Sequence, residues 1–86
     1  MKVEKIMEAI MEKNNVSKAQ LGRAVGIEDK KNPSDVINKR MKQKNISVNV
    51  LGEMLSKMGY TLAVVPVGTA LKEEDGKYEV TIDEEA

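Results

Sequence analysis

The stretch that decides the fold runs from Ser17 to Ile27 and reads SKAQLGRAVGI. Ser17 can cap the start of a helix, and Gln20, three residues later, completes a capping box. Gly26 suits the left-handed backbone that ends a helix, and Ile27 supplies the apolar contact beyond it. We therefore predict a short helix here, with a buried face formed by Leu21, Ala24 and Val25.

A second capped helix is predicted after a polar turn at residues 28–32. Asn32 precedes Pro33, which is the order of an N-cap followed by proline at the first helical position. Asp35 then falls where a carboxylate interacts favourably with the positive end of the helix dipole. The side chains expected to point inward are Val36, Ile37 and Met41. Those expected outside are Ser34, Asp35, Asn38, Lys39, Arg40 and Lys42.

Two amphipathic segments flank this pair of helices. Apolar residues in the segment 2–13 recur at i, i+3, i+4, i+7 and i+8, which predicts a helix that ends at Asn14 and Asn15. Ser47 can cap a last helix that Gly59 ends, and its apolar face comprises Val50, Leu51, Met54, Leu55 and Met58. A short capped helix, a turn, a basic helix and a supporting helix follow one another in this order in helix-turn-helix proteins.

Beyond residue 60 the periodicity changes from helical to alternating. Residues 60–67 are mostly apolar and β-branched, with Pro66 at a strand end or sheet edge, and residues 77–83 alternate between apolar and polar side chains. We expect a C-terminal β-hairpin. The chain then divides into a helical DNA-binding domain, 1–60, and a hairpin extension, 61–86, that serves dimerisation or partner binding.

Composition excludes several functions. The 86 residues include no Cys and no His, so the chain lacks thiolate metal ligands and the commonest general base. We see no grouping of residues that suggests an enzyme, a metal site or a cofactor. No apolar run approaches the ~20 residues of a membrane span, and the N-terminus does not resemble a signal peptide. We expect a cytoplasmic protein with no membrane partner.

The net charge of zero hides an uneven distribution. Residues 1–60 carry twelve basic and seven acidic residues, whereas residues 61–86 carry two and seven. Residues 30–44 alone hold six basic residues against Asp35. A concentrated basic segment is typical of a protein that binds a polyanion such as DNA, although a basic helix can also be a solvated surface.

Residues 17–66 resemble the lambda-repressor-like, or XRE-type, helix-turn-helix family. The resemblance is carried by the stretch 17–27, by VINKRMK at residues 36–42, by Asn45-Ile46-Ser47 and by LSKMGY at residues 55–60. The sequence departs from the family at Gly22, where Ala is usual, at Ile46, where an aromatic residue is usual, and in its longer turn at residues 28–33. The resemblance implies a mainly α fold of four to five helices, to which the C-terminal β-hairpin is added.

The resemblance also implies double-stranded DNA as the partner and the helix after Pro33 as the one that enters the major groove. Ser34 and Asn38 would then meet base edges, and Lys39 would reach either a base edge of guanine or a phosphate. Lys18 lies where family members contact a phosphate, and the backbone N–H groups of Ser17 and Lys18 can do the same. Further candidate contacts, as phosphate clamps or as solvated side chains, are Lys31, Arg40, Lys42 and Lys44. Asp35 either accepts from cytosine or is only a partner of the helix dipole.

The sequence therefore predicts a sequence-specific transcriptional regulator that occupies an operator, in the form of a homodimer. Two alternatives are a protein-interaction module and an antitoxin, whose C-terminal strands would bind a partner protein. The operator, the direction of regulation and the pairing of the hairpin within or between chains stay open.

Overall fold

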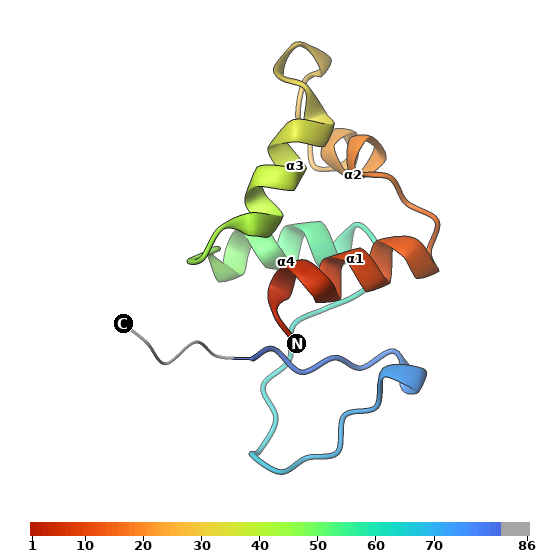
Figure 1. Ribbon diagram of the computed structural model, residues 1–86, viewed down its shortest axis with the longest axis vertical. Helices are drawn as coiled ribbons and strands as arrows, with labels where there is room; N and C mark the ends of the chain where they lie inside the picture. Colours follow the sequence, from red (N-terminus) through yellow and green to blue (C-terminus); the bar gives the residue numbers. More distant parts are fainter. Residues whose placement is uncertain (82–86) are drawn as a thin grey trace.

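The computed structural model of the protein describes residues 1–81, which are mainly helical (Figure 1). These residues contain four α-helices and two short 3-10 turns. The helices are α1 (Val3–Lys13), α2 (Lys18–Ala24), α3 (Pro33–Lys42) and α4 (Val48–Ser56). The turns are η1 (Asp29–Lys31), between α2 and α3, and η2 (Glu73–Asp75), in the C-terminal segment.

The predicted helix caps are confirmed. The Ser17 side chain and Gln20 form the capping box, and the Ser47 side chain accepts a hydrogen bond from the backbone N–H of Val50. Asn32 adopts a left-handed conformation and its side chain accepts from the backbone N–H of Asp35. Gly26, with φ of 87°, has the left-handed backbone expected beyond the second helix. These caps act within three or four residues of chain, which is why the sequence shows them.

The core is aliphatic and is drawn from all four helices. Each of four residues, Leu21, Ile37, Leu51 and Leu55, was predicted on the inward face of its helix, and all four are buried in one cluster, which confirms those predictions. The other members of this cluster are Ile6, Met7, Ile10, Met11, Met41 and Met54. Unbranched methionine side chains fill the irregular spaces that a core without Phe or Trp leaves.

The buried face of α2 is narrower than predicted. Leu21 is buried and Val25 is half-buried, but Ala24 is exposed, so its predicted burial is wrong. The reason is that α2 packs against α3 through Gly22. A Cβ atom at Gly22 would lie 2.6 Å from the Cβ of Pro33 and 2.8 Å from its carbonyl oxygen. Glycine at this position therefore allows the two helices to touch at the backbone.

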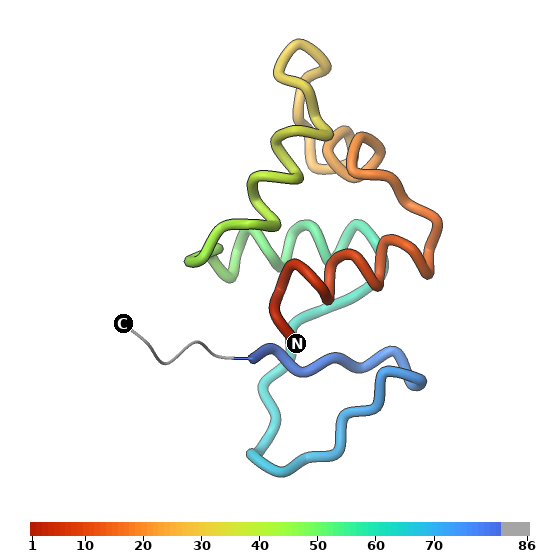
Figure 2. The backbone as a smooth tube through the Cα atoms, viewed as in Figure 1, coloured from red at the N-terminus to blue at the C-terminus, as the bar shows by residue number. Residues whose placement is uncertain are grey.

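The predicted C-terminal β-hairpin is wrong for the described residues, since residues 60–81 contain no strand. The chain leaves α4 as an extended segment, turns through η2 and returns beneath the N-terminus (Figure 2). Residues 61–67 are exposed along their whole length. Of the second predicted strand, residues 82 and 83 lie outside the described residues.

The returning segment pairs with the N-terminus and not with residues 61–67. The backbone N–H of Thr81 donates to the carbonyl of Met1 at 2.8 Å, and the Met1 amino group donates to the carbonyl of Glu79 at 2.8 Å. Tyr60 and Tyr78 are partly buried against the helical core. The alternating pattern of residues 77–81 thus reflects packing on the helices, with Tyr78 as the inward residue.

No helix in the described part of the chain is both long enough and apolar enough to cross a membrane. The acidic residues of η2 are exposed, and residues 1–81 contain no cluster of acidic side chains that could hold a metal ion.

Candidate nucleic-acid interface

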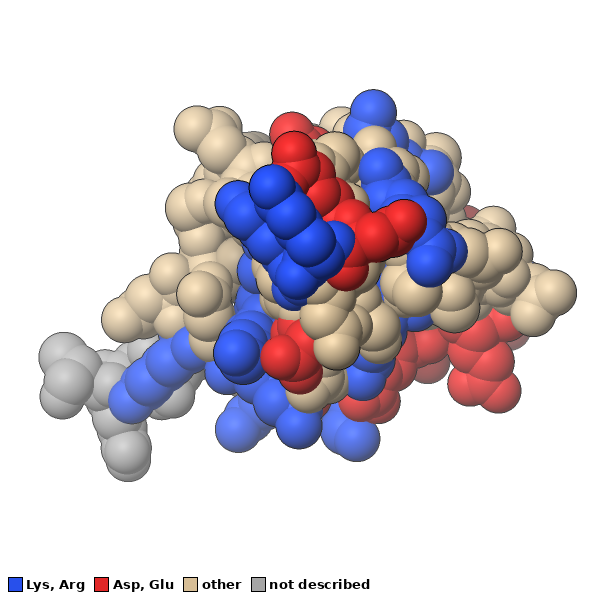
Figure 3. All heavy atoms as spheres, turned by 90° about the horizontal axis from the view of Figure 1, so that it is seen from above, with Lys and Arg blue, Asp and Glu red and all other residues tan. Residues whose placement is uncertain are grey.

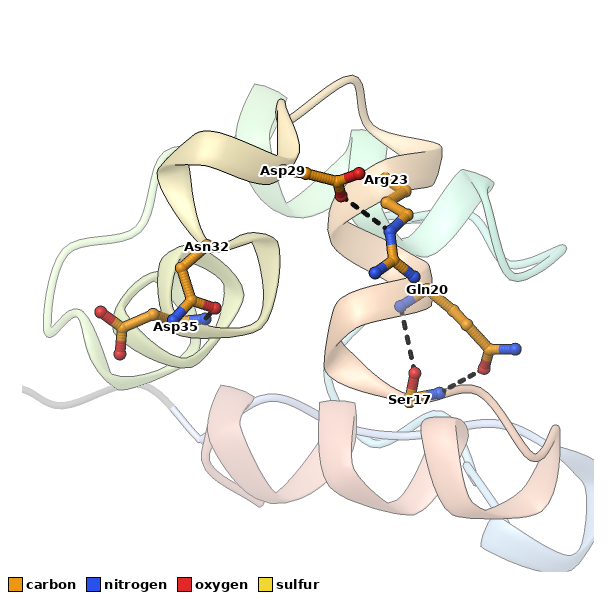
Figure 4. Close-up of polar contacts among 6 residues, drawn as sticks. All are labelled: Ser17, Gln20, Arg23, Asp29, Asn32 and Asp35. Carbon is orange, nitrogen blue, oxygen red and sulfur yellow. Dashed lines mark hydrogen bonds and ion pairs between the residues drawn. The ribbon is translucent and has the colours of Figure 1, made fainter.

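The start of α2 is fixed by the Ser17 capping box (Figure 4). The Ser17 hydroxyl accepts from the backbone N–H of Gln20 at 3.1 Å, and the Ser17 N–H donates to Oε1 of Gln20 at 2.8 Å. The N–H of Ser17, which the sequence offered as a phosphate contact, is therefore already occupied. The capping box instead fixes the backbone at the start of α2, from which the Lys18 side chain projects.

Lys18 connects the start of α2 to the middle of α3. Its Nζ donates to Oδ1 of Asn38 at 2.6 Å, and both residues are half-buried. The bond uses the acceptor end of the Asn38 amide and leaves its Nδ2, with two N–H donors, as the end that can bind another molecule. Two residues that are twenty positions apart, both predicted to contact DNA, thus form one polar unit.

The outer side of α3 carries a second group of predicted residues. Asp35 and Lys39 form an ion pair of 3.6 Å between Oδ2 and Nζ, and both are exposed. Lys42, three residues after Lys39, is exposed as well and falls on the same side of the helix. Ser34 is half-buried and lies one turn before Asn38, on the side that faces α2.

A third group lies where the end of α2 meets η1. Lys31 and Arg40 line the same shallow hollow, whose other walls are Val25, Gly26, Ile27, Glu28 and Val36. Lys31 is exposed, whereas Arg40 is half-buried. These predicted residues are therefore not one continuous patch: they lie on the α2 side of α3, on its outer side and around this hollow.

The candidate interface is less basic than the sequence suggests. Arg23 of α2 donates from Nε to Oδ1 of Asp29 at 2.9 Å, and Nζ of Lys30 lies 3.2 Å from a carboxylate oxygen of Glu28. Figure 3, which views the molecule from the end that carries η1, shows basic and acidic side chains next to one another. These exposed ion pairs contribute little to stability, but they reduce the local positive charge.

The pairing of Arg23 with Asp29 was not predicted. The two residues lie six positions apart across a turn, and no helical or strand periodicity relates them, so the sequence contains no signal for this contact. The ion pair of Asp35 and Lys39, in contrast, has the i, i+4 spacing that brings side chains together on a helix.

Comparison of this chain with protein-family models, curated proteins and solved structures found no match. The resemblance to the lambda-repressor-like family therefore rests on the sequence motifs themselves.

Proposed function

We propose that α2 and α3 together bind double-stranded DNA sequence-specifically, as in the lambda-repressor-like family, and that the protein regulates transcription by occupying an operator. The observation that carries the proposal is the 2.6 Å hydrogen bond from Lys18 to Asn38. It joins the first residue of one helix to the middle of the next. In a helix-turn-helix protein these elements face the DNA backbone and the base edges.

Within this proposal α3 lies in the major groove. Asn38 donates from Nδ2 to an acceptor on a base edge while its Oδ1 is held by Lys18, and Ser34 contacts a base one turn earlier. Lys39, Lys42, Arg40 and Lys31 contact phosphates. Asp35 is paired with Lys39, which favours a role in orienting this lysine over direct reading of cytosine.

The ion pairs add a requirement to the proposal. A lysine that contacts a phosphate has to give up its carboxylate partner or share it, so binding should release fewer counterions than the count of basic residues in 30–44 suggests. The salt dependence of the affinity reports this number, because the slope of log K against log salt scales with the phosphates that are neutralised.

The experiment that tests the proposal is selection of bound sequences from a random pool of duplex DNA, followed by titration of the enriched site at several salt concentrations. An enriched motif, with affinity that falls as salt rises, supports operator binding. Recovery of sequences no different from the input pool, or an affinity that does not respond to salt, contradicts it.

A second candidate function, a protein-interaction module or antitoxin, is favoured by the exposed apolar residues of 61–67, among them Val64, Val65 and Val67. Binding to a protein through these residues would depend weakly on salt, which separates it from binding to DNA.

A further inference from the structure

Two features of the segment 61–67 have no role in the single chain. All of its residues are exposed, and Val64 and Val67 are fully so. In addition, no backbone N–H between residues 61 and 67 donates to another backbone group of the described chain. Extended β-branched chain with unpaired backbone groups is a template on which another strand can add.

Only part of the segment 61–67 is free to pair with another strand. The N–H of Tyr60 donates to the carbonyl of Leu55, which holds residue 60 on its own helix. Pro66 has no N–H and cannot take part in a ladder. Residues 61–65 therefore form the part that is available for pairing, and Ala63 is its midpoint.

We propose that residues 61–65 pair antiparallel with the same residues of a second copy of this chain, with the two Ala63 residues facing each other on a two-fold axis. This inference goes beyond the proposed DNA binding and does not rest on it. A two-fold axis that relates a strand to its copy makes the two strands antiparallel, so the same segment supplies both sides of the contact.

Charge favours a second copy as the occupant. Residues 61–71 contain no charged side chain, so two copies can pair without bringing like charges together. Protected sheet edges commonly carry lysine, and this segment carries none.

The pairing also explains the side chains of the segment. In the antiparallel register Leu62 of one copy lies opposite Val64 of the other, on one face of the two-stranded ribbon. Leu62 already approaches α4, where its Cδ1 would lie 3.8 Å from a Cβ at Gly52. Association would therefore cover Val64, which is fully exposed in the single chain, from the side of α4.

The test is the apparent mass of the full chain in sedimentation over a wide range of micromolar concentrations. The parent should rise toward about twice the monomer mass. Val64→Lys should stay monomeric, while Val67→Lys, an equally exposed valine beyond Pro66, should associate like the parent. Circular dichroism checks that both variants keep the helical content of the parent.

A charge exchange at the axis distinguishes self-pairing from other contacts. Ala63→Lys and Ala63→Glu each place like charges opposite each other, so each variant alone should be monomeric, and a mixture of the two should associate. The inference is overturned if the parent is monomeric throughout, which would leave the segment to a different kind of partner. It is equally overturned if the Ala63 and Val64 variants associate as the parent does, or if the mixture stays monomeric.

Discussion

At Gly22, α2 lies directly against the first residue of α3. Because residue 22 has no side chain, α2 and α3, the two helices of the candidate interface, approach each other closely at this point. The sequence alone suggests only that glycine weakens a helix in which the related family usually has alanine. The contact with Pro33 gives the residue a different role, because a Cβ would lie within 3.0 Å of three Pro33 atoms, two of them backbone.

We therefore expect Gly22→Ala to lower the free energy of unfolding by about 1–3 kcal/mol, since overpacking outweighs the gain in helix propensity. Gly52→Ala is the matched control. Gly52 also lies inside a helix, and its added Cβ would meet only Leu62 at 3.8 Å, so this change should stabilise by up to about 1 kcal/mol. Denaturant unfolding measures both values. Equal effects of the two changes would contradict the close packing of α2 on α3.

Lys39 offers a second test at the scale of the residue, because α1 contains a close counterpart. Lys39 is exposed and paired with Asp35 on its own helix, and Lys5 is exposed and paired with Glu8 in the same way. If α3 contacts DNA, Lys39→Ala should weaken binding to the selected site and reduce the salt slope by about one, while Lys5→Ala should leave both unchanged. Equal affinities of the two variants would remove Lys39 from the interface.

At the scale of the element, the sequence predicts the features that depend on contacts between residues close together along the chain. Three helices begin directly after Ser17, Asn32 and Ser47, because each of these side chains bonds to the backbone three residues later, a contact that the sequence can show. The prediction of a β-hairpin was wrong because a strand needs a partner strand, and the alternation of apolar and polar residues does not show where that partner lies. Residues 79 and 81 bond to Met1, and within the described residues 1–81 no strand lies beside residues 61–67.

The same limit applies to the candidate site. The sequence predicted Lys18 and Asn38 separately, each from its place on a helix, but their hydrogen bond depends on how α2 crosses α3. That crossing follows from the contact of Gly22 with Pro33, which no local pattern encodes.

The predicted packing of α4 can be tested within one helix. Leu55 is buried in the core cluster, and Val48, at the start of α4, is 72% exposed. Leu55→Ala should lower the free energy of unfolding by about 2–5 kcal/mol, a large part of the stability of a small domain. Val48→Ala should change it by less than about 0.5 kcal/mol. Thermal unfolding followed by circular dichroism compares the two variants, and a Leu55 variant as stable as the parent would show that α4 does not pack as described.

At the scale of the whole molecule, the core and the C-terminal segment are unequal in their contribution to stability. All ten buried apolar residues of the core belong to α1–α4, whereas residues 61–81 add only partly buried side chains and the hydrogen bonds to Met1. The helical part therefore contains the interactions needed to fold, and the segment contributes a smaller cover on one side of it, as Figure 1 shows.

A chain that ends at residue 60 should accordingly stay helical and unfold cooperatively. It should lose about 1–2 kcal/mol of stability, because Tyr78 no longer packs on the core and the bonds to Met1 are absent. It should also stay monomeric at concentrations where the full chain associates, since residues 61–65 are gone. Circular dichroism with heating measures the first result and sedimentation the second. An unfolded product would mean that the segment is an integral part of the fold, and a product that still associates would locate the contact between copies on the helices.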